Sequence, residues 1–377
     1  ALALEKYGTM DLARLIEPAR RLAAEGFRVT PAFARSLQRS AAGLSLFPES
    51  NRIFLKEGRA WQVGELFTQA DLALTLERVQ AMGRDGFYRG ETAEHIVAAM
   101  EAYDGLITAT DLAEYVPVER EVLRGTYRGL EILTMPPPSS GGIALIQMLH
   151  MLEPYDLAAM GFQGSDTLHL MTEVMRRAFR DRAEFPGDPA FVQVPSKGLI
   201  DPAYARARMA DFDPKQASRS AAIQPGDPKG LESSDTTHFS IIDGDGHAVS
   251  NTYTLNLPYG NKVTVPGTGV LLNNEMDDFT SKPGVPNFYG LIQGEANAIA
   301  GGKRPLSSMT PTIVLQGGEP ELILGTPGGP TIFTTVYQVL INLYDFGMSL
   351  PEAVAVPRFH HQLYPVDELR VDASAPL

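Results

Sequence analysis

The sequence contains no cysteine, and this absence removes several kinds of chemistry at once. Disulfide bonds, thiolate metal sites and a cysteine nucleophile are excluded, although the compartment is not decided, because secreted proteins without disulfides are ordinary. Positive charge is also scarce: 32 Lys and Arg face 45 Asp and Glu, which gives a formal net charge of −13. Such an excess of negative charge disfavours nucleic acids and anionic membranes as partners.

Long apolar runs are missing as well. No stretch approaches the roughly 20 apolar residues that a membrane-spanning helix needs. The first residues show no initiator Met and no signal peptide pattern, so we expect a chain that is truncated relative to its gene product. The 377 residues, 44% of them hydrophobic, still suffice for one large or two ordinary globular domains.

The hydrophobic spacing changes along the chain. Residues 1–115 repeat apolar side chains at helical intervals, with Gly26 as a C-cap and Thr30-Pro31 as a helix start. Residues 118–135 change to a period of two around a turn at 127–129, which predicts two paired strands. Further helices are expected at 142–152, 167–183 and about 331–346, and strands from 236 up to the last of these helices. This order of elements favours an α+β sandwich of antiparallel sheets.

A second hairpin is predicted between Thr236 and Asn256. β-Branched and aromatic residues flank Asp243-Gly244-Asp245-Gly246, which suits a tight turn and lacks the full pattern of a calcium loop. The preceding segment 215–235 is polar and holds prolines and glycines, so we expect an exposed loop. A cut in this loop would leave an N-terminal threonine, which carries a hydroxyl nucleophile and an amine base in one residue.

Several long motifs in order share the pattern of one enzyme family. They are Thr236-Thr237-His238-Phe239-Ser240, Thr252-Tyr253-Thr254-Leu255-Asn256, Leu271-Leu272-Asn273-Asn274-Glu275-Met276-Asp277-Asp278-Phe279, Lys303-Arg304-Pro305-Leu306-Ser307-Ser308, Gly325-Thr326-Pro327-Gly328-Gly329, Pro357-Arg358-Phe359-His360-His361 and, earlier, Met135-Pro136-Pro137-Pro138-Ser139-Ser140-Gly141-Gly142. Together they resemble the γ-glutamyltransferases (γ-glutamyltranspeptidases), which are N-terminal nucleophile hydrolases. The resemblance implies a four-layer αββα sandwich. It also implies self-cleavage into a large-subunit part, 1–235, and a small-subunit part, 236–377.

The resemblance places the nucleophile at Thr236, freed by cleavage between Asp235 and Thr236. A free α-amine has a pKa of roughly 7.7–8.0 and is suited to take the hydroxyl proton near neutral pH. Thr237 is a rival position that the residues themselves leave open. The hydroxyl of Thr254 is implied to hydrogen-bond the nucleophile's oxygen.

An oxyanion hole is implied at Gly328 and Gly329, where no Cβ blocks the approach of backbone N–H groups. Without the resemblance, two glycines between prolines would be interpreted as a turn. The expected catalytic residues are therefore Thr236, Thr254, Gly328 and Gly329.

Binding of a γ-glutamyl group is implied at both of its ends. Asn256, Glu275 and Asp278 are expected to hold the α-amine, because an ammonium favours carboxylate and amide oxygens. The hydroxyls of Ser307 and Ser308 are expected to donate to the α-carboxylate. Asp277 beside Asp278 leaves the carboxylate assignment open between neighbours, and a solvated acidic turn is the structural alternative.

A lid is implied over Lys282–Gly301, including Tyr289, although any long surface loop shares this composition. His360 and His361 are interpreted as structural residues, since no carboxylate lies at ligand spacing, and neither a metal nor a cofactor is expected. The arginine that the family uses for the α-carboxylate has no match here, and the family's chain continues past Asp372. For this chain alone we expect a partly uncovered sheet and low activity.

The function implied is that of a γ-glutamyltransferase or glutathione hydrolase, made as a zymogen. It would transfer the γ-glutamyl group of glutathione through a threonine ester to water or to an amino acid or peptide. The two parts would form a heterodimer, in the periplasm or secreted. A glutaryl-cephalosporin acylase of the same fold is the alternative, against which Asp278 argues. An inactive fragment that binds γ-glutamyl peptides is a further one.

Overall fold

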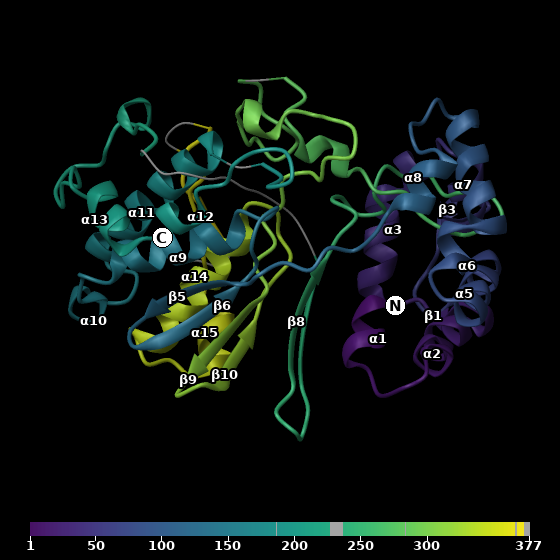
Figure 1. Cartoon of the computed structure of the whole chain (residues 1–377), viewed down its shortest axis with the longest axis horizontal. Coiled ribbons are helices and arrows are strands. Elements are labelled where there is room, and N and C mark those ends of the chain that lie inside the picture. The colour runs from purple at the N-terminus through teal and green to yellow at the C-terminus, as the bar shows by residue number, and fades with distance from the viewer. Residues whose placement is uncertain (186, 227–236, 283, 366–367, 373–377) are drawn as a thin grey trace. The chain divides into compact units, whose positions relative to one another are not determined.

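The computed structural model describes residues 1–185, 187–226, 237–282, 284–365 and 368–372. The chain forms two compact units, and Figure 1 colours it from purple at the N-terminus to yellow at the C-terminus. The first unit combines Ala1–Glu119 with Leu257–Asn274, and the second combines Arg120–Asn256 with Glu275–Leu377. None of the boundaries between these units lies at residue 235. The expected division into parts 1–235 and 236–377 therefore stays a prediction.

The first unit is mainly helical, as predicted for residues 1–115. Its helices are α1 (Leu2–Tyr7), α2 (Leu12–Glu25), α3 (Pro31–Leu44), α4 (Pro48–Phe54), α5 (Ala70–Met82), α6 (Asp85–Tyr88), α7 (Gly90–Ala102) and α8 (Ala109–Glu114). Short strands pair as β1 (Phe27–Arg28) with β4 (Leu66–Phe67), and β2 (Leu55–Lys56) with β3 (Arg59–Ala60).

Capping residues fix where these helices start and stop. Gly26 ends α2 with a φ of 83°, and the Thr30 hydroxyl accepts from Phe33 N at 3.2 Å to start α3, so both predictions are confirmed. The later segment Leu257–Asn274 folds into the same unit. There Ser50 Oγ donates to Lys262 O at 2.6 Å and accepts from Thr264 N at 2.9 Å.

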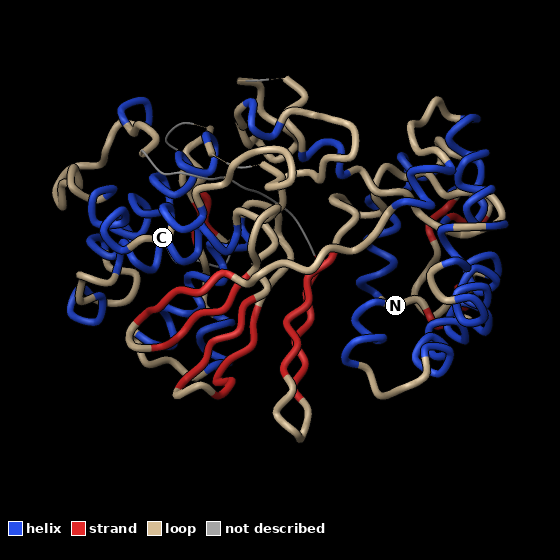
Figure 2. Tube along the Cα trace, in the orientation of Figure 1, coloured by secondary structure: helices blue, strands red, loops and turns tan. Residues whose placement is uncertain are grey.

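The largest sheet described in the second unit has four antiparallel strands (Figure 2). Its order is β10-β9-β6-β5, with bounds β5 (Leu123–Tyr127), β6 (Leu130–Thr134), β9 (Thr312–Gln316) and β10 (Glu319–Leu324). The predicted turn between β5 and β6 is confirmed, with φ values of 50° at Arg128 and 81° at Gly129. In the pairing of β6 with β9, Ile132 faces Val314, so the sheet joins segments from both sides of position 235.

Helices cover one side of this sheet and bury its apolar residues. They are α9 (Gly141–Leu152), α10 (Leu157–Met160), α11 (Ser165–Glu184), α12 (Ser196–Leu199), α13 (Pro202–Arg208), α14 (Thr331–Tyr344) and α15 (Leu350–Ala355), with a 3₁₀ turn η1 (Ser220–Ala222). All residues of α9 are buried, as expected of a helix that is apolar all round. Met148, Val174 and Phe333 meet Ile132 and Val314 in one core.

The second predicted hairpin is confirmed as β7 (Thr237–Ile242) and β8 (Ala248–Tyr253). It approaches β10, where Ser250 Oγ donates to Leu324 O at 3.0 Å. Its apolar side chains remain largely in solvent: Ile241 is 55% and Tyr253 58% exposed. A pair of strands with an exposed apolar surface agrees with the expectation of a partly uncovered sheet.

The expectation that strands dominate from 236 to the last long helix is wrong. Between Tyr253 and Thr312 the described residues form loops, isolated bridges and the 3₁₀ turns η2 (Glu275–Asp278) and η3 (Glu295–Asn297). In this region side chains form hydrogen bonds with backbone groups that would otherwise pair between strands. Thr280 Oγ1, for example, donates to Gly294 O at 2.8 Å. Strand β11 (Phe359–His360) pairs with β12 (Arg370–Val371) near the C-terminus. None of the helices described here is long and apolar enough to cross a membrane.

Candidate active site

The expected nucleophile and cleavage site, Thr236 and Asp235, lie outside the described residues. The strand that follows them starts at Thr237, which pairs with Tyr253 on β8. Thr254 comes directly after β8, and its Oγ1 accepts from Asn256 N at 2.7 Å. This places the Thr254 hydroxyl at the same end of the hairpin as Thr237, and its role toward the nucleophile stays a prediction.

The start of β7 is packed against the glycine-rich segment 325–329. A Cβ at Gly325 would lie 2.3 Å from Nδ1 of His238, so a glycine is needed for the strand to come this close. The His238 ring is held by Thr252 Oγ1 at 3.0 Å and Ser240 Oγ at 2.9 Å. Burial lowers the pKa of His238, which favours a neutral imidazole at this contact.

Gly328 and Gly329 form the loop that leads into α14. Their φ values of 137° and 62° lie in the region that glycine adopts without strain. The loop is fastened to the first turn of α14: Thr331 Oγ1 donates to Gly328 O at 2.7 Å, and Ile332 N donates to Gly329 O at 3.0 Å. These bonds engage the carbonyl oxygens of both glycines. An oxyanion would instead accept hydrogen bonds from the glycine N–H groups.

Asn256 and Tyr289 meet, although 33 residues separate them. The Tyr289 hydroxyl donates to Asn256 O at 3.2 Å. Asn256 is 9% exposed and has a φ of 70°, a conformation that Asn tolerates better than most residues. The segment around Tyr289 is anchored at Leu291, which is 3% exposed, whereas Val285 and Phe288 are 47% and 66% exposed, so its role as a lid stays a prediction.

The two neighbouring aspartates of the acidic turn η2 have different surroundings. Asp278 is 1% exposed, and its carbonyl oxygen accepts from Gln293 Nε2 at 3.1 Å and Asn297 Nδ2 at 2.6 Å. Asp277 instead accepts from Phe288 N at 3.2 Å through Oδ2. Glu275 opens the same turn and is half-buried. The two aspartates thus differ in burial, and the role of Asp278 toward a substrate stays a prediction.

Ser307 and Ser308 lie beside the proline-serine motif of the earlier part of the chain. Ser307 forms a parallel bridge with Ser139, and Ser307 O accepts from Ser140 N at 2.9 Å. Ser308 is fully buried, and Arg182 Nη2 lies 3.5 Å from its Oγ. The sequence placed Arg182 on a helix but assigned it no role at the serine pair, since the two are 126 positions apart.

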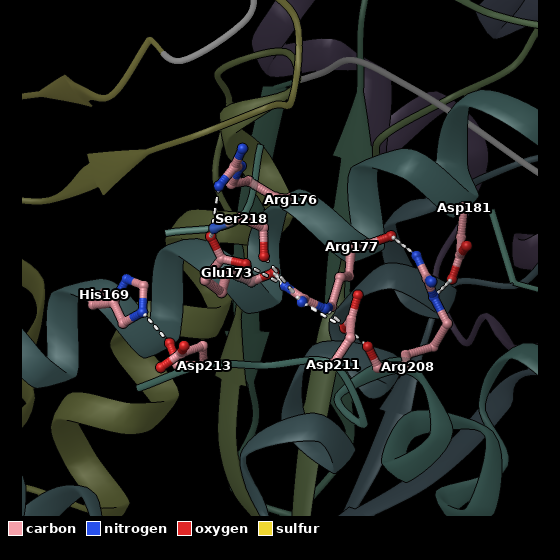
Figure 3. A network of polar contacts seen from close by, with 9 residues as sticks. All are labelled: His169, Glu173, Arg176, Arg177, Asp181, Arg208, Asp211, Asp213 and Ser218. Carbon is pink, nitrogen blue, oxygen red and sulfur yellow. Dashed lines mark hydrogen bonds and ion pairs between the residues drawn. The ribbon is translucent and has the colours of Figure 1, made fainter. Parts of the chain in front are cut away.

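A buried network of charges on α11 holds the segment that follows α13 (Figure 3). Glu173 accepts from Arg176 Nη1 at 2.5 Å, from Ser218 N at 3.1 Å and from Arg177. Burial alone would raise the pKa of Glu173, but the bonds from Ser218 and Arg177 lower it overall. Arg177 also reaches Asp211 at 2.7 Å. The network therefore fixes the backbone up to residue 218 with an ionised carboxylate.

Two residues that the sequence pointed to gain partners that it did not show. His360 was expected to be structural, and both of its ring nitrogens lie against protein groups, Thr334 and Gln362. His238, inside the first family motif, received no role from the sequence and now explains why Gly325 is a glycine. The sequence could not have shown this contact, because His238 and Gly325 lie 87 positions apart.

Comparison with known proteins agrees with the family resemblance of the sequence motifs. The sequence matches the family model described as gamma-glutamyltranspeptidase over residues 1–376. It is 47% identical over 375 residues to the glutathione hydrolase proenzyme of Escherichia coli (strain K12), covering 99% of this chain and 64% of that protein. It is 41% identical over 357 residues to the acylase ACY 1 proenzyme of Pseudomonas sp. (strain SE83), covering 94% and 61%. The crystal structure of cephalosporin acylase from Bacillus halodurans superposes with a TM-score of 0.85 at 28% identity, covering 95% of this chain and 63% of that chain.

The chain thus spans less than two thirds of the length of these relatives. The structural similarity confirms the expected α+β fold of the N-terminal nucleophile hydrolase type. The match over nearly every residue, together with the shared motifs at the site, establishes that this chain belongs to the gamma-glutamyltranspeptidase family.

Proposed function

We propose that this polypeptide is part of an enzyme that cleaves itself before Thr236 and then transfers γ-glutamyl groups. The substrates would be glutathione and other γ-glutamyl amides, and the acceptors water, amino acids or peptides. The observation that supports this most is the packing of β7 on the glycine loop. His238 contacts Gly325 while Thr331 holds Gly328, so the start of β7 lies beside the segment that carries the expected oxyanion donors.

The chemistry requires two displacement steps at one carbonyl carbon. Thr236 Oγ would attack the γ-carbonyl, its proton passing to the Thr236 amine, while Gly328 and Gly329 N–H groups stabilise the oxyanion. The leaving amine would take that proton as the C–N bond breaks, leaving a threonine ester. Water or an acceptor amine would then attack the ester, and the Thr236 hydroxyl would regain a proton. Thr254 would orient the nucleophile's oxygen.

The buried carboxylate of Asp278 supports a substrate that carries an α-amine. With Glu275 and the Asn256 side chain it offers acceptors to an ammonium, whereas Ser307 and Ser308 offer hydroxyls to a carboxylate. A glutaryl group lacks the amine that these acceptors would bind. The acylase named among the relatives makes glutaryl transfer the second candidate, and the amine is the feature that separates the two.

Both expected parts of the chain contribute to both compact units, which supports a stable heterodimer after cleavage. Strand β6 of the first part pairs with β9 of the second part over Glu131–Thr134. Segment Leu257–Asn274 of the second part is built into the first unit, as in the Thr75 Oγ1 bond to Thr268 O at 2.9 Å. A cut near 235 would therefore leave two pieces held by a shared sheet and core. From the family resemblance we also propose that such an enzyme acts in the periplasm or outside the cell.

Intact mass and N-terminal sequencing of the full-length polypeptide would test this function first. Two pieces with a new terminus at Thr236-Thr237-His238 would support the proposal, and a terminus at Thr237 would move the nucleophile by one residue. Rates on γ-glutamyl-p-nitroanilide and on glutaryl-p-nitroanilide would follow. Faster glutaryl hydrolysis would favour the acylase, and an uncut, inactive polypeptide would exclude the proposed enzyme.

A further inference from the structure

A chain of buried hydrogen bonds links the expected lid segment to helix α14. Tyr289 O accepts from Gln362 Nε2 at 2.9 Å, and Gln362 Oε1 lies 3.0 Å from His360 Nε2. On its other side, His360 Nδ1 lies 2.9 Å from Thr334 Oγ1 on α14. Gln362 and His360 are each 5% exposed, so water does not compete freely for these groups.

The direction of each bond follows from the groups at its ends. A backbone carbonyl only accepts, so the amide nitrogen of Gln362 points at Tyr289 and the amide oxygen points at His360. In a neutral ring His360 Nε2 then carries the hydrogen and Nδ1 is the acceptor, and the Thr334 hydroxyl lies within reach of both Nδ1, at 2.9 Å, and Thr331 O, at 3.1 Å. Burial lowers the pKa of His360 to about 4, so the ring remains neutral and in this tautomer near pH 7.

The same helix turn carries the oxyanion loop. Thr334 lies one turn after Thr331, whose Oγ1 and N both donate to Gly328 O, at 2.7 and 3.2 Å. Gln338 fastens β11 to this turn, since its Nε2 donates to Thr334 O and to Phe359 O, both at 2.8 Å. His360 is thereby fixed on a rigid support between the helix and the lid segment.

The far end of the chain of bonds reaches the expected amine ligand. Tyr289 uses its carbonyl oxygen toward Gln362 and its hydroxyl toward Asn256 O, at 3.2 Å. A single residue of the lid segment therefore joins the Asn256 backbone to β11. Each step of the path from Gly328 to Asn256 is a hydrogen bond or the backbone of one short element.

We propose that Gln362 and His360 are positioning residues that hold the lid segment at Tyr289 in register with the loop of Gly328 and Gly329. The substrate amine ligand, the lid and the oxyanion donors would then keep one relative geometry. The catalytic part of this inference rests on the proposed function. The structural link between the lid segment and α14 does not depend on it.

Hydrogen–deuterium exchange on the full-length polypeptide with Gln362→Met tests the link. Methionine keeps nearly the same volume and makes neither hydrogen bond. We expect amide exchange over 285–291 to rise about tenfold, the size of effect of one buried hydrogen bond. We also expect KM for γ-glutamyl-p-nitroanilide to rise several-fold, with a smaller change in kcat, because the lid holds substrate more than it polarises the carbonyl.

Gln163→Met is the matched control. Gln163 Nε2 donates to Pro357 O at 2.8 Å, the same type of bond, but it touches neither the lid nor the glycine loop. It should leave exchange over 285–291 and KM unchanged. The double variant with His360→Leu should exceed Gln362→Met only slightly, since both break one path.

Unchanged exchange over 285–291 in Gln362→Met, or an equal rise in Gln163→Met, would overturn the proposal. The proposed function can fail separately. If the parent polypeptide hydrolyses no γ-glutamyl amide while exchange still rises in Gln362→Met alone, the link between lid and helix stands and the enzyme assignment falls.

Discussion

The two hairpins of the second unit follow the same local rules and have opposite surroundings. Hairpin β5–β6 turns at Arg128-Gly129, and β6 is buried, with Ile132 1% exposed. Hairpin β7–β8 turns at the Asp-Gly repeat, and Ile241 on it is 55% exposed. Isolated two-stranded hairpins are marginal in water, so the first gains its stability from packing and the second from a few contacts to β10 and Gly325. The hairpin that leads from the expected nucleophile is thus the less well anchored one.

Matched isoleucine substitutions should show the largest difference between the hairpins. Ile132→Ala leaves a cavity against Val314 and the helices, and should lower the free energy of unfolding by about 2–5 kcal/mol. Ile241→Ala on β7 should change it by no more than about 0.5 kcal/mol. Urea denaturation of this chain measures both. Equal effects would show that β7–β8 is packed as tightly as β5–β6.

The turn of the first hairpin depends on a buried ion pair. Arg128 binds Asp345 at 2.7 Å and the carbonyl oxygens of Glu153 and Tyr155, both at 2.8 Å. Arg128→Ala would leave the Asp345 carboxylate, at 4% side-chain exposure, with the Tyr127 hydroxyl at 2.7 Å but without its cation, and should cost about 3 kcal/mol of unfolding free energy. Arg124→Ala on the same hairpin removes an exposed pair with Glu131 and should cost less than about 1 kcal/mol. A similar loss for both would contradict the distinction.

The contact of β7 with the glycine loop should control self-cleavage. Gly325→Ala brings a methyl group onto the His238 ring and should slow cleavage before Thr236 about 100-fold, equivalent to about 2.7 kcal/mol. Gly244→Ala lies in the turn of the same hairpin, where an added Cβ meets nothing within 4 Å, and should cleave normally. Gel analysis of cleavage over time in the full-length polypeptide compares the two. Normal cleavage by Gly325→Ala would separate this contact from processing.

The smallest effect is expected from pH at the same contact. Burial lowers the pKa of His238 in the folded state below its unfolded value of about 6.5. The stabilisation is therefore complete above pH 6.5 and is lost as the pH falls through the folded-state value. Amide protection factors over 237–242 should fall several-fold between pH 7 and 5, and less in His238→Gln. An identical decrease in both would assign the titration to another group.

Local features were predictable because neighbouring residues determine them. The Thr30 cap, the Gly26 helix end and the positive φ of Arg128-Gly129 all follow from groups within four positions of one another. The expected strands between 254 and 311 were wrong for a related reason. Their backbone groups bond to distant side chains, such as Asn297 to Asp278 O, and periodicity does not register such partners.

The candidate site divides in the same way. The motifs named Thr254, Gly328, Ser307 and Asp278, but only burial distinguished Asp278 from Asp277. Only the structure shows that Arg182, His238 and Gln362 contact Ser308, Gly325 and Tyr289.

The sequence by itself determined the family, the two hairpins, most helices and the identity of the expected site residues, because motif order and local periodicity are properties of the chain alone. The tertiary structure decided which hairpin is buried, which aspartate is enclosed and how the segment around Tyr289 is linked to the loop of Gly328 and Gly329. These outcomes depend on groups that meet across about 15 to 180 positions, where pairing is set by the packing of whole elements.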